Sequence, residues 1–311
     1  MFFQFDGELK EISVSDIDST LITAGYVNPE ELKRYSTQFG FSESTVQQCL
    51  EELRYFRTKI EVYDTYSFGT LKITDAGNVR SNEDFIAFYI KKNFLLLVDI
   101  KDGDRSTYND FSRALRRFPP ATITLEKLFF AFIDSLLLDD KRELEDFGFK
   151  INRLEQSVLE GDVNKDFNIE LCGLKKDMLV LFNYYEQLVD VGEELQENEN
   201  DLFTEEDLRY FKIFTDKAQK FSDNVRTQRD NLAQLQDAYS AALDIKLNST
   251  MKLFTVITSI FLPLTLVTSW YGMNFRYMPE LSWKYSYPCV FAACMLISVI
   301  CIIIFKKKKL I

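Results

Sequence analysis

The chain has 311 residues, with 37 basic and 48 acidic side chains, no histidine and a formal net charge of −11. Without histidine the chain lacks the commonest transition-metal ligand and proton carrier, so its composition gives no support to an enzymatic function. Residues 1–245 carry a net charge of −18 and residues 246–311 a net charge of +7. A part this acidic argues against nucleic acid as a partner, and it concentrates cations near its surface.

Residues 1–120 are predicted to form a cytoplasmic mixed α/β domain. The N-terminal sequence MFFQFDGELK has no basic segment ahead of an apolar run, so we expect no secretory signal peptide and a cytoplasmic location. Turn signals separate three β-rich runs, which cover residues 66–73, 84–90 and 93–100. Residues 121–204 are predicted to be a helical cytoplasmic region, because no proline occurs between Pro120 and Pro263.

A long stalk helix is predicted over residues 205–252. Thr204 followed by Asp207 resembles a capping box with Asp in place of Glu, which marks the start of a helix. From Phe211 onward, apolar residues recur every three or four positions over about four heptads, and such a seam needs partner helices. By itself the seam fits an ordinary coiled-coil tether equally well.

Aspartates recur every seven residues along this stalk and therefore stay near one side of it. They are Asp216, Asp223, Asp230, Asp237 and Asp244. Without further information, the pattern is typical of a solvated helix face.

Two uncharged segments, residues 253–271 and 285–305, have about the ~20 residues needed to cross a bilayer as helices. A loop over residues 272–284 joins them. The basic tail, residues 306–311, contains Lys306, Lys307, Lys308 and Lys309, and two lysines precede the first segment. By the positive-inside rule both termini are cytoplasmic and the loop is external, so we expect a multi-pass protein of the cell membrane.

One face of the first predicted membrane helix combines hydroxyl groups with apolar side chains. Its residues are spaced by three or four, and they are Met251, Phe254, Thr258, Leu262, Thr265 and Ser269. Several copies of this helix around an axis would make a narrow conduit with alternating wet and dry layers. Taken alone, the stripe fits helix packing better, because Ser and Thr are also small interface residues in membranes.

The motifs of the C-terminal region, in their order, resemble those of the CorA family of magnesium channels. The resemblance is strong from about residue 205 onward and fainter in the N-terminal part, where it rests on RTKIE at residues 57–61. The C-terminal motifs are MKLF at 251–254, FLPLT at 261–265, YGMNF at 271–275, MPEL at 278–281 and the lysine tail.

The resemblance implies a homopentamer in the lipid bilayer, with an α/β cytoplasmic funnel, a central stalk and five first membrane helices around the pore. Gly272, Met273 and Asn274 would form the selectivity filter, with Asn274 holding hydrated Mg²⁺ through its waters. Gly272 suits a sharp backbone turn close to a ligand. The expected pore-lining residues are Asn248, Met251, Phe254, Thr258, Leu262 and Thr265, to which the stripe adds Ser269.

The resemblance also bears on regulation by intracellular Mg²⁺. Asp237 matches an acidic ring on the inner face of the stalk and is expected, with Asn274, to contact metal. Ile213 stands where the family has an acidic residue of its inter-subunit regulatory site. Possible regulatory ligands in this chain are Asp75, Glu83, Asp216, Asp223, Asp230 and Asp244.

Three further residues depart from the family pattern. Arg276 directly follows the YGMNF motif, where an acidic residue is common, and it puts a positive charge near a cation entrance. Phe254 and Leu262 stand where Leu and Met are common, so the apolar constriction that they form with Met251 is similar in kind but altered in shape.

The expected function is passive uptake of Mg²⁺ driven by the membrane potential, through a channel gated by intracellular Mg²⁺. Two alternatives remain open. One is transport of Co²⁺, Ni²⁺ or Zn²⁺ by a member of the same superfamily, although the intact GMN motif and the absence of histidine argue against a dedicated zinc role. The other is a membrane-anchored coiled-coil scaffold without transport activity.

Overall fold

A computed structural model describes the chain except for residues 52–55, 81–82, 162, 164 and 309–311. The chain divides into two compact units, Met1–Gln234 and Leu235–Ile311. Each unit is described separately below.

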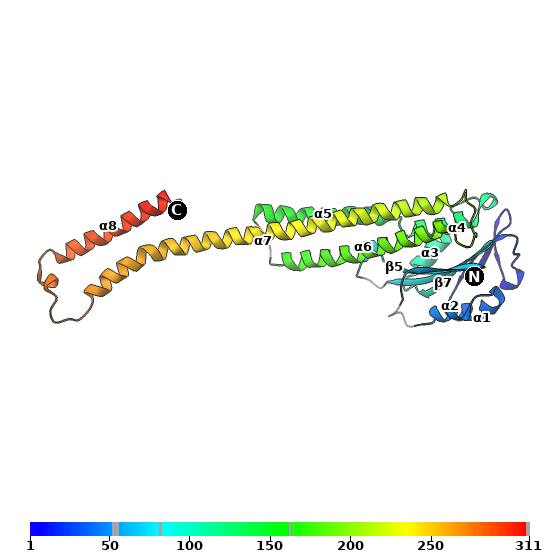
Figure 1. The fold of residues 1–311 in the computed structure, drawn as a ribbon, viewed down its shortest axis with the longest axis horizontal. Helices are drawn as coiled ribbons and strands as arrows, with labels where there is room; N and C mark the ends of the chain where they lie inside the picture. Colours follow the sequence, from blue (N-terminus) through cyan, green and yellow to red (C-terminus); the bar gives the residue numbers. More distant parts are fainter. Residues whose placement is uncertain (52–55, 81–82, 162, 164, 309–311) are drawn as a thin grey trace. The chain divides into compact units, whose positions relative to one another are not determined.

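The first unit is built on a seven-stranded sheet with the order β2-β1-β3-β7-β6-β5-β4 (Figure 1). The pair β3 and β7 is parallel and all other neighbours are antiparallel. The strands are β1 (Phe2–Phe5), β2 (Leu9–Ile12), β3 (Ile22–Val27), β4 (Lys59–Tyr63), β5 (Tyr66–Ile73), β6 (Asp84–Lys91) and β7 (Phe94–Lys101). The three predicted β-rich runs are confirmed as β5, β6 and β7.

Helices cover both faces of this sheet (Figure 1). On one face, Leu32 and Val46 join a core with Phe68, Tyr89 and Leu96 of the strands. On the other face, Phe88 of β6 contacts Phe129 with ring centroids 4.8 Å apart. The helices are α1 (Pro29–Phe39) and α2 (Glu43–Gln48) on the first face, and α3 (Ser106–Ala114) and α4 (Leu125–Ser135) on the second.

Two long helices, α5 (Asp140–Glu160) and α6 (Phe167–Glu197), precede a third, α7 (Arg209–Tyr271). Helix α7 begins four residues after the expected boundary at 205. In the turn before the helix, the carbonyl of Thr204 accepts the N–H of Asp207 at 3.0 Å and that of Leu208 at 3.2 Å. The reciprocal bond of the predicted capping box is made by another residue: Glu126 of α4, and not Asp207, accepts the Thr204 N–H at 3.0 Å. Asp207 instead accepts a hydrogen bond from the Thr124 hydroxyl at 3.0 Å.

Most of the apolar seam of the stalk within the first unit is buried, including Phe214, Val225 and Leu232. Phe211 is 0% exposed, and its ring contacts Phe203 at a centroid distance of 4.8 Å. Phe221 contacts Tyr185 of α6, with centroids 5.4 Å apart. The partner helices that the seam requires therefore include helices of the same chain.

The second unit contains the apolar end of α7, a loop with the short 3₁₀ helix η5 (Pro279–Ser282), and α8 (Ser286–Lys307). Pro263 lies inside α7, and the helix continues through it to Tyr271. The apolar part of α7 and α8 run in opposite directions (Figure 1). Both helices are long and apolar enough to cross a membrane.

Candidate ion pathway and acidic cavity

The residues expected to line a pore lie together on one exposed face of α7. Leu262 is 72% exposed and Phe254 is 58% exposed within the single chain. The other five expected residues are also exposed, namely Asn248, Met251, Thr258, Thr265 and Ser269. All seven side chains are thus available to a neighbouring molecule or to an aqueous path.

Two hydroxyl groups on this face donate to the backbone of their own helix. Thr258 Oγ1 donates to the carbonyl of Phe254 at 2.7 Å, and Thr265 Oγ1 donates to that of Phe261 at 2.8 Å. Since each hydroxyl has one proton and two lone pairs, these bonds leave only acceptor capacity for a species outside the helix. Water molecules around a hydrated cation are donors and suit such oxygens.

The opposite face of α7 is the covered one. Val256 is buried, and five partly buried positions follow it at helical spacing: Ser259, Ile260, Pro263, Leu264 and Val267. Helix α8 has a matching series at Val290, Cys294, Ile297, Cys301 and Phe305. We infer that α7 and α8 pack through these two faces, which leaves the hydroxyl stripe out of their contact.

Helix α7 ends at the GMN sequence. The N–H of Gly272 donates to the carbonyls of Thr268 at 3.0 Å and Ser269 at 3.2 Å. Gly272 forms a turn directly after the helix end without adopting the left-handed backbone. Its special property is the close approach of carbonyls: a Cβ there would lie 3.2 Å from the Thr268 oxygen. Met273, Asn274 and Arg276 are exposed beyond this helix end.

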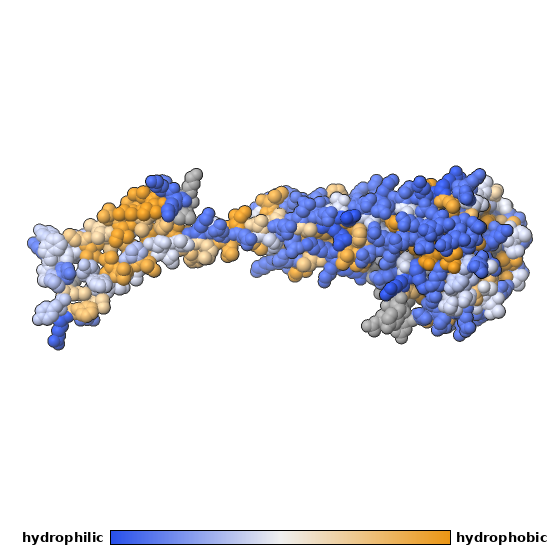
Figure 2. Space-filling view, in the orientation of Figure 1, coloured by the Kyte–Doolittle hydropathy of each residue, from blue (hydrophilic) through white to orange (hydrophobic). Residues whose placement is uncertain are grey.

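Less hydrophobic residues lie at both ends of the apolar part of the second unit (Figure 2). The loop end carries the exposed rings of Trp270, Phe275, Tyr277, Trp283 and Tyr285. The other end carries Lys306, Lys307 and Lys308, whereas Lys309 lies outside the described residues. Aromatic rings at the interface and lysines beyond it are typical of a segment that spans a membrane.

The five stalk aspartates are exposed along α7 and are not gathered into one site. Asp216, Asp223 and Asp230 belong to the first unit, and Asp237 and Asp244 to the second. Asp223 accepts a hydrogen bond from Gln219 at 3.1 Å.

The other two acids expected to be regulatory have partners within the chain. Asp75 accepts the Gly77 N–H at 2.8 Å and caps the 3₁₀ helix η3 (Ala76–Asn78). Glu83 forms an ion pair with Lys72 at 2.7 Å, so its charge is already balanced. Ile213, at the position of the missing family acid, is exposed.

The structure reveals an acidic cavity that the sequence reasoning missed. It has a volume of about 320 Å³ and lies in the first unit. Its walls include Asp75, Asp84, Asp104, Asp110, Asp139 and Asp140, with Arg113 as their one basic residue. One carboxylate oxygen from each of Asp84, Asp102 and Asp104 lies within 4.8 Å of the others. Among the described residues, no other set of three or more Asp, Glu or Cys side chains comes this close together.

Burial perturbs the groups around this cavity. It raises the pKa of Asp84, and the charges of Asp102 and Asp104 add to the effect. Burial also raises the pKa of Asp140 to about 7, against the hydrogen bond donated by the Tyr185 hydroxyl at 2.9 Å. The pKa of Tyr184 is raised well above its ordinary value by burial and then by the charges of Asp140, Asp110 and Asp75.

The sequence held a signal for part of this cluster. Asp84 starts β6, and the Asp102-Gly103-Asp104 turn follows β7. In an antiparallel pair the start of one strand lies beside the end of the other. Had the two β-rich runs been paired, Asp84 would have been placed next to Asp102.

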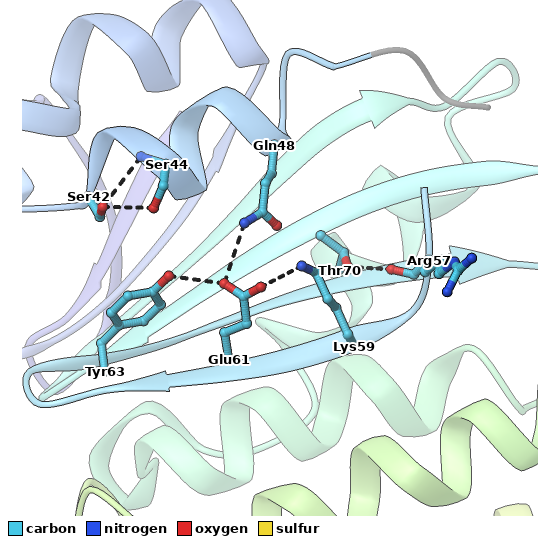
Figure 3. Close-up of polar contacts among 8 residues, drawn as sticks. All are labelled: Ser42, Ser44, Gln48, Arg57, Lys59, Glu61, Tyr63 and Thr70. Carbon is cyan, nitrogen blue, oxygen red and sulfur yellow. Dashed lines mark hydrogen bonds and ion pairs between the residues drawn. The ribbon is translucent and has the colours of Figure 1, made fainter. Parts of the chain in front are cut away.

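The RTKIE sequence lies at the sheet edge and has a structural role (Figure 3). Glu61 of β4 accepts hydrogen bonds from Lys59, from the Tyr63 hydroxyl at 3.0 Å and from Gln48 of α2 at 3.4 Å. Burial acts to raise the pKa of Glu61, but the hydrogen bonds and the charge of Lys59 outweigh it and the pKa is lowered. This carboxylate joins α2 to β4.

Two long apolar helices joined to a large polar unit define an integral membrane protein. The family of CorA-like Mg²⁺ transporter proteins matches residues 22–307, and the chain belongs to this family. It is 31% identical to the cobalt/magnesium transport protein CorA of Thermotoga maritima, over 97% of this chain and 89% of that protein.

Solved structures share the fold over nearly the whole chain. The complete CorA magnesium transporter from Methanocaldococcus jannaschii has a TM-score of 0.79 at 22% identity, covering 98% of this chain and 97% of that one. The full-length CmaX protein has a TM-score of 0.75 at 15% identity, covering 98% and 96%. The predicted combination of α/β domain, long helix and two C-terminal apolar helices is thereby confirmed.

Proposed function

We propose that the chain forms a homopentameric channel through which Mg²⁺ enters the cell passively. The observation that carries the proposal is the exposed stripe of α7, which lies opposite the face toward α8 and leads to Asn274. An amphipathic membrane helix that leaves its hydroxyl-bearing face uncovered within the chain needs like helices around it, and five copies would surround a path with this face.

The proposed filter consists of Gly272, Met273 and Asn274. Mg²⁺ gives up its waters reluctantly, so a ring of neutral Asn274 amides would select the hydrated ion by hydrogen bonds to those waters. Neutral oxygens bind weakly enough for release, whereas a ring of carboxylates would hold the ion longer. Beneath the filter, Thr265 and Thr258 offer acceptor oxygens, and Leu262, Phe254 and Met251 form an apolar constriction.

The proposed orientation places both termini in the cytoplasm and the filter outside. The basic residues after α8 support it by the positive-inside rule. A divalent cation that crosses ~100 mV inward gains about 4.6 kcal/mol, twice the value for one elementary charge. This gain is sufficient for net uptake without a nucleotide-driven step.

Closure by intracellular Mg²⁺ is the regulatory part of the proposal. The first unit is strongly acidic, and Asp216, Asp223, Asp230, Asp237 and Asp244 are exposed along α7. Mg²⁺ bridging such carboxylates between subunits would hold a closed arrangement. If conductance of the reconstituted protein does not change when Mg²⁺ is withdrawn from the cytoplasmic side, this part is wrong.

Co²⁺ is the second candidate substrate. The relative from Thermotoga maritima is named a cobalt/magnesium transport protein. A filter that contacts only the hydration shell would pass Co²⁺ as well, because it recognises the waters and not the metal. Uptake of Mg²⁺ in the presence of Co²⁺ or Ni²⁺ measures this competition.

The decisive experiment is Mg²⁺ flux into liposomes that contain the purified full-length protein. We expect flux in the wild type, loss of selective uptake in Asn274→Ala, and slower, more easily saturated uptake in Asn274→Asp. Asn78→Ala, an exposed change in the first unit, is the matched control and should behave as wild type. Size-exclusion chromatography checks that every variant keeps the same oligomeric state.

If Asn274→Ala takes up Mg²⁺ as the wild type does, Asn274 is not part of the filter. Absence of any cation flux in the wild type would favour the scaffold over the channel.

A further inference from the structure

A groove between α6 and α7 carries positive charge, although residues 1–245 have a net charge of −18. It lies in the first unit and has a volume of about 590 Å³. Its basic residues are Lys175, Arg226 and Arg229, and Asp230 is its one acidic residue. Of the ion pairs found in the described part of the chain, none includes Arg226 or Arg229. Two such guanidinium groups favour a carboxylate as partner, because their paired N–H donors match its two oxygens.

The rest of the groove wall is apolar. Leu179 is 46% exposed, and Ala233 is exposed as well. Phe182 is half-buried, and Arg229 Cζ lies over its ring, 4.8 Å from the centroid. This contact holds the charge of Arg229 beside the apolar wall. A segment that fits the groove would therefore bring an apolar side chain next to an acidic one.

Helix α5 presents such a pair of side chains on its outer face. Its inner face buries Leu144 and Phe147. Glu145 and Phe149, one turn apart, lie on the opposite side of the helix, and Phe149 is 70% exposed. Glu145 pairs with Lys141 at 3.9 Å, but an ion pair between exposed side chains is weak. Both Glu145 and Phe149 are thus available to a partner.

The groove and the outer face of α5 lie on different sides of α7. Gln228 Nε2 donates to the carbonyl of Leu144 at 2.9 Å, so Gln228 points toward α5. Arg226 stands two residues earlier and therefore points about 160° away from Gln228 around the helix axis. In Figure 1, α5 and α6 flank α7. Phe149 therefore cannot reach the groove of its own chain, and the contact requires a second copy.

The two surfaces lie at the same level along the helices. Helices α5 and α7 run in the same direction (Figure 1). Because both rise by the same distance per residue, the hydrogen bond of Gln228 places each α5 residue level with the α7 residue 84 positions later. Glu145 is thus level with Arg229, and Phe149 is level with Ala233.

We propose that the outer face of α5 in one copy binds the groove between α6 and α7 in the next copy. Phe149 then packs against Leu179 and Ala233, and Glu145 pairs with the two guanidinium groups. The inference rests on the proposed homopentamer, whose copies are related by rotation about an axis along α7 and so keep the same levels. Because the two surfaces differ, the contact is head-to-tail and can close a ring.

Photo-crosslinking of the full-length protein in detergent tests the contact directly. With p-benzoylphenylalanine in place of Phe149, we expect crosslinks to residues 179–182 or 226–233 of another copy, mapped by mass spectrometry. Mixing ¹⁵N-labelled with unlabelled chains distinguishes links between copies from links within one chain. The same group in place of Lys33, an exposed residue of α1, is the control and should not reach these segments. Links from position 149 to other segments only, or none between copies, would overturn the proposal.

Charge reversal supplies the second measurement. Arg226→Glu combined with Arg229→Glu should weaken association of the copies roughly tenfold or more, because it sets like charges against Glu145. Adding Glu145→Arg should restore association to within about threefold of wild type, since the pair is then re-formed with reversed signs. Lys33→Glu combined with Arg34→Glu changes the net charge equally at exposed positions and should associate as wild type. Mass photometry over a dilution series measures association, and no recovery with Glu145→Arg would contradict the pairing.

Flux measured on the same preparations separates this contact from the proposed channel. Pentamers that conduct Mg²⁺ while the crosslinks lie elsewhere would overturn the contact and leave the channel in place. Chains that stay monomeric and carry no flux would overturn both.

Discussion

The two halves of helix α7 carry the same apolar spacing but bury it differently. In the first half, Phe211, Phe214 and Val225 are 0% exposed. In the second half, Met251, Phe254 and Leu262 are all more than half exposed. A three-four pattern therefore indicates that a helix needs a partner, and it does not tell whether the partner is the same chain, another copy or lipid.

The distribution of charged residues distinguishes the two halves of α7 better than the apolar spacing does. The first half interleaves its apolar positions with charged residues and packs against helices of its own unit, whereas residues 253–271 contain no charge. The same periodicity thus serves a water-soluble core in one unit and a membrane helix in the other.

One pair of variants tests this contrast with the same chemical change. Phe211→Ala should destabilise the first unit by roughly 3–5 kcal/mol, because it empties a buried site. Phe254→Ala should change its stability by less than ~0.5 kcal/mol, because the side chain is exposed in the chain and belongs to the second unit. Hydrogen exchange of the β6 and β7 amides in urea reports on the first unit. Similar protection losses in both variants would contradict the contrast.

Flux measurements on the same two proteins extend the test. Phe254→Ala should alter the Mg²⁺ uptake rate if it lines the constriction, with the fold of the first unit intact.

A glycine pair tests how closely the buried half of α7 approaches α6. A Cβ at Gly192 would lie 2.2 Å from Thr215 Oγ1, whereas a Cβ at Gly148 would meet nothing within 4 Å. Gly192→Ala should therefore lower stability by roughly 1–3 kcal/mol through overpacking. Gly148→Ala, inside α5, should raise it by about 0.5–1 kcal/mol through helix propensity. Denaturation midpoints by circular dichroism give the sign, and a stable Gly192→Ala variant would refute the close approach.

Asp140 allows a test of how the stability of the first unit, which contains the buried half of α7, depends on pH. Its pKa is raised by burial from an ordinary 3.8 to about 7. The folded state therefore holds the proton more tightly, and stability falls as pH rises from about 4 to about 7. In EDTA, Asp140→Asn should be more stable than wild type at pH 8, by up to roughly 4 kcal/mol, and should melt like wild type at pH 4.

The exposed Asp146→Asn is the control for this measurement. Parallel melting curves of wild type and Asp140→Asn across this pH range would show that Asp140 does not titrate as described.

Substitution of Arg276, in the exposed loop between α7 and α8, is expected to have the smallest effect on Mg²⁺ uptake. Arg276→Glu should raise the initial rate of Mg²⁺ uptake a few-fold at low ionic strength, because it replaces a repelling charge near the proposed entrance. The gain should shrink toward ~0.15 M salt, where the screening length is ~8 Å. A rate change that salt leaves unaltered would assign Arg276 a role other than long-range electrostatics.

Local pattern predicted much of the fold. Alternation and turn residues located β5, β6 and β7, the absence of proline before Pro263 predicted long helices, and uncharged runs located α8 and the end of α7. These features depend on the sequence neighbourhood of each residue, which is why they can be read without a structure.

Contacts between distant segments were not predicted. The sequence neighbourhood of Thr204 suggested Asp207 as its partner, yet Glu126, 78 positions away, accepts its N–H. The acidic cavity likewise joins Asp84, Asp104 and Asp140 from separate elements. The GMN residues and the stripe were identified by motif and spacing, and their roles remain predictions until flux is measured.

The internal hydrogen bonds of Thr258 and Thr265 have a consequence for charge discrimination. With both protons committed to the main chain, these hydroxyls turn lone pairs outward. An anion such as chloride seeks donors and would find none from these two groups, whereas the outward-facing protons of a hydrated cation would be accepted. In the proposed pathway, the sign of the permeating ion would then be sensed by the polarity of oriented water, without any carboxylate on the helix face.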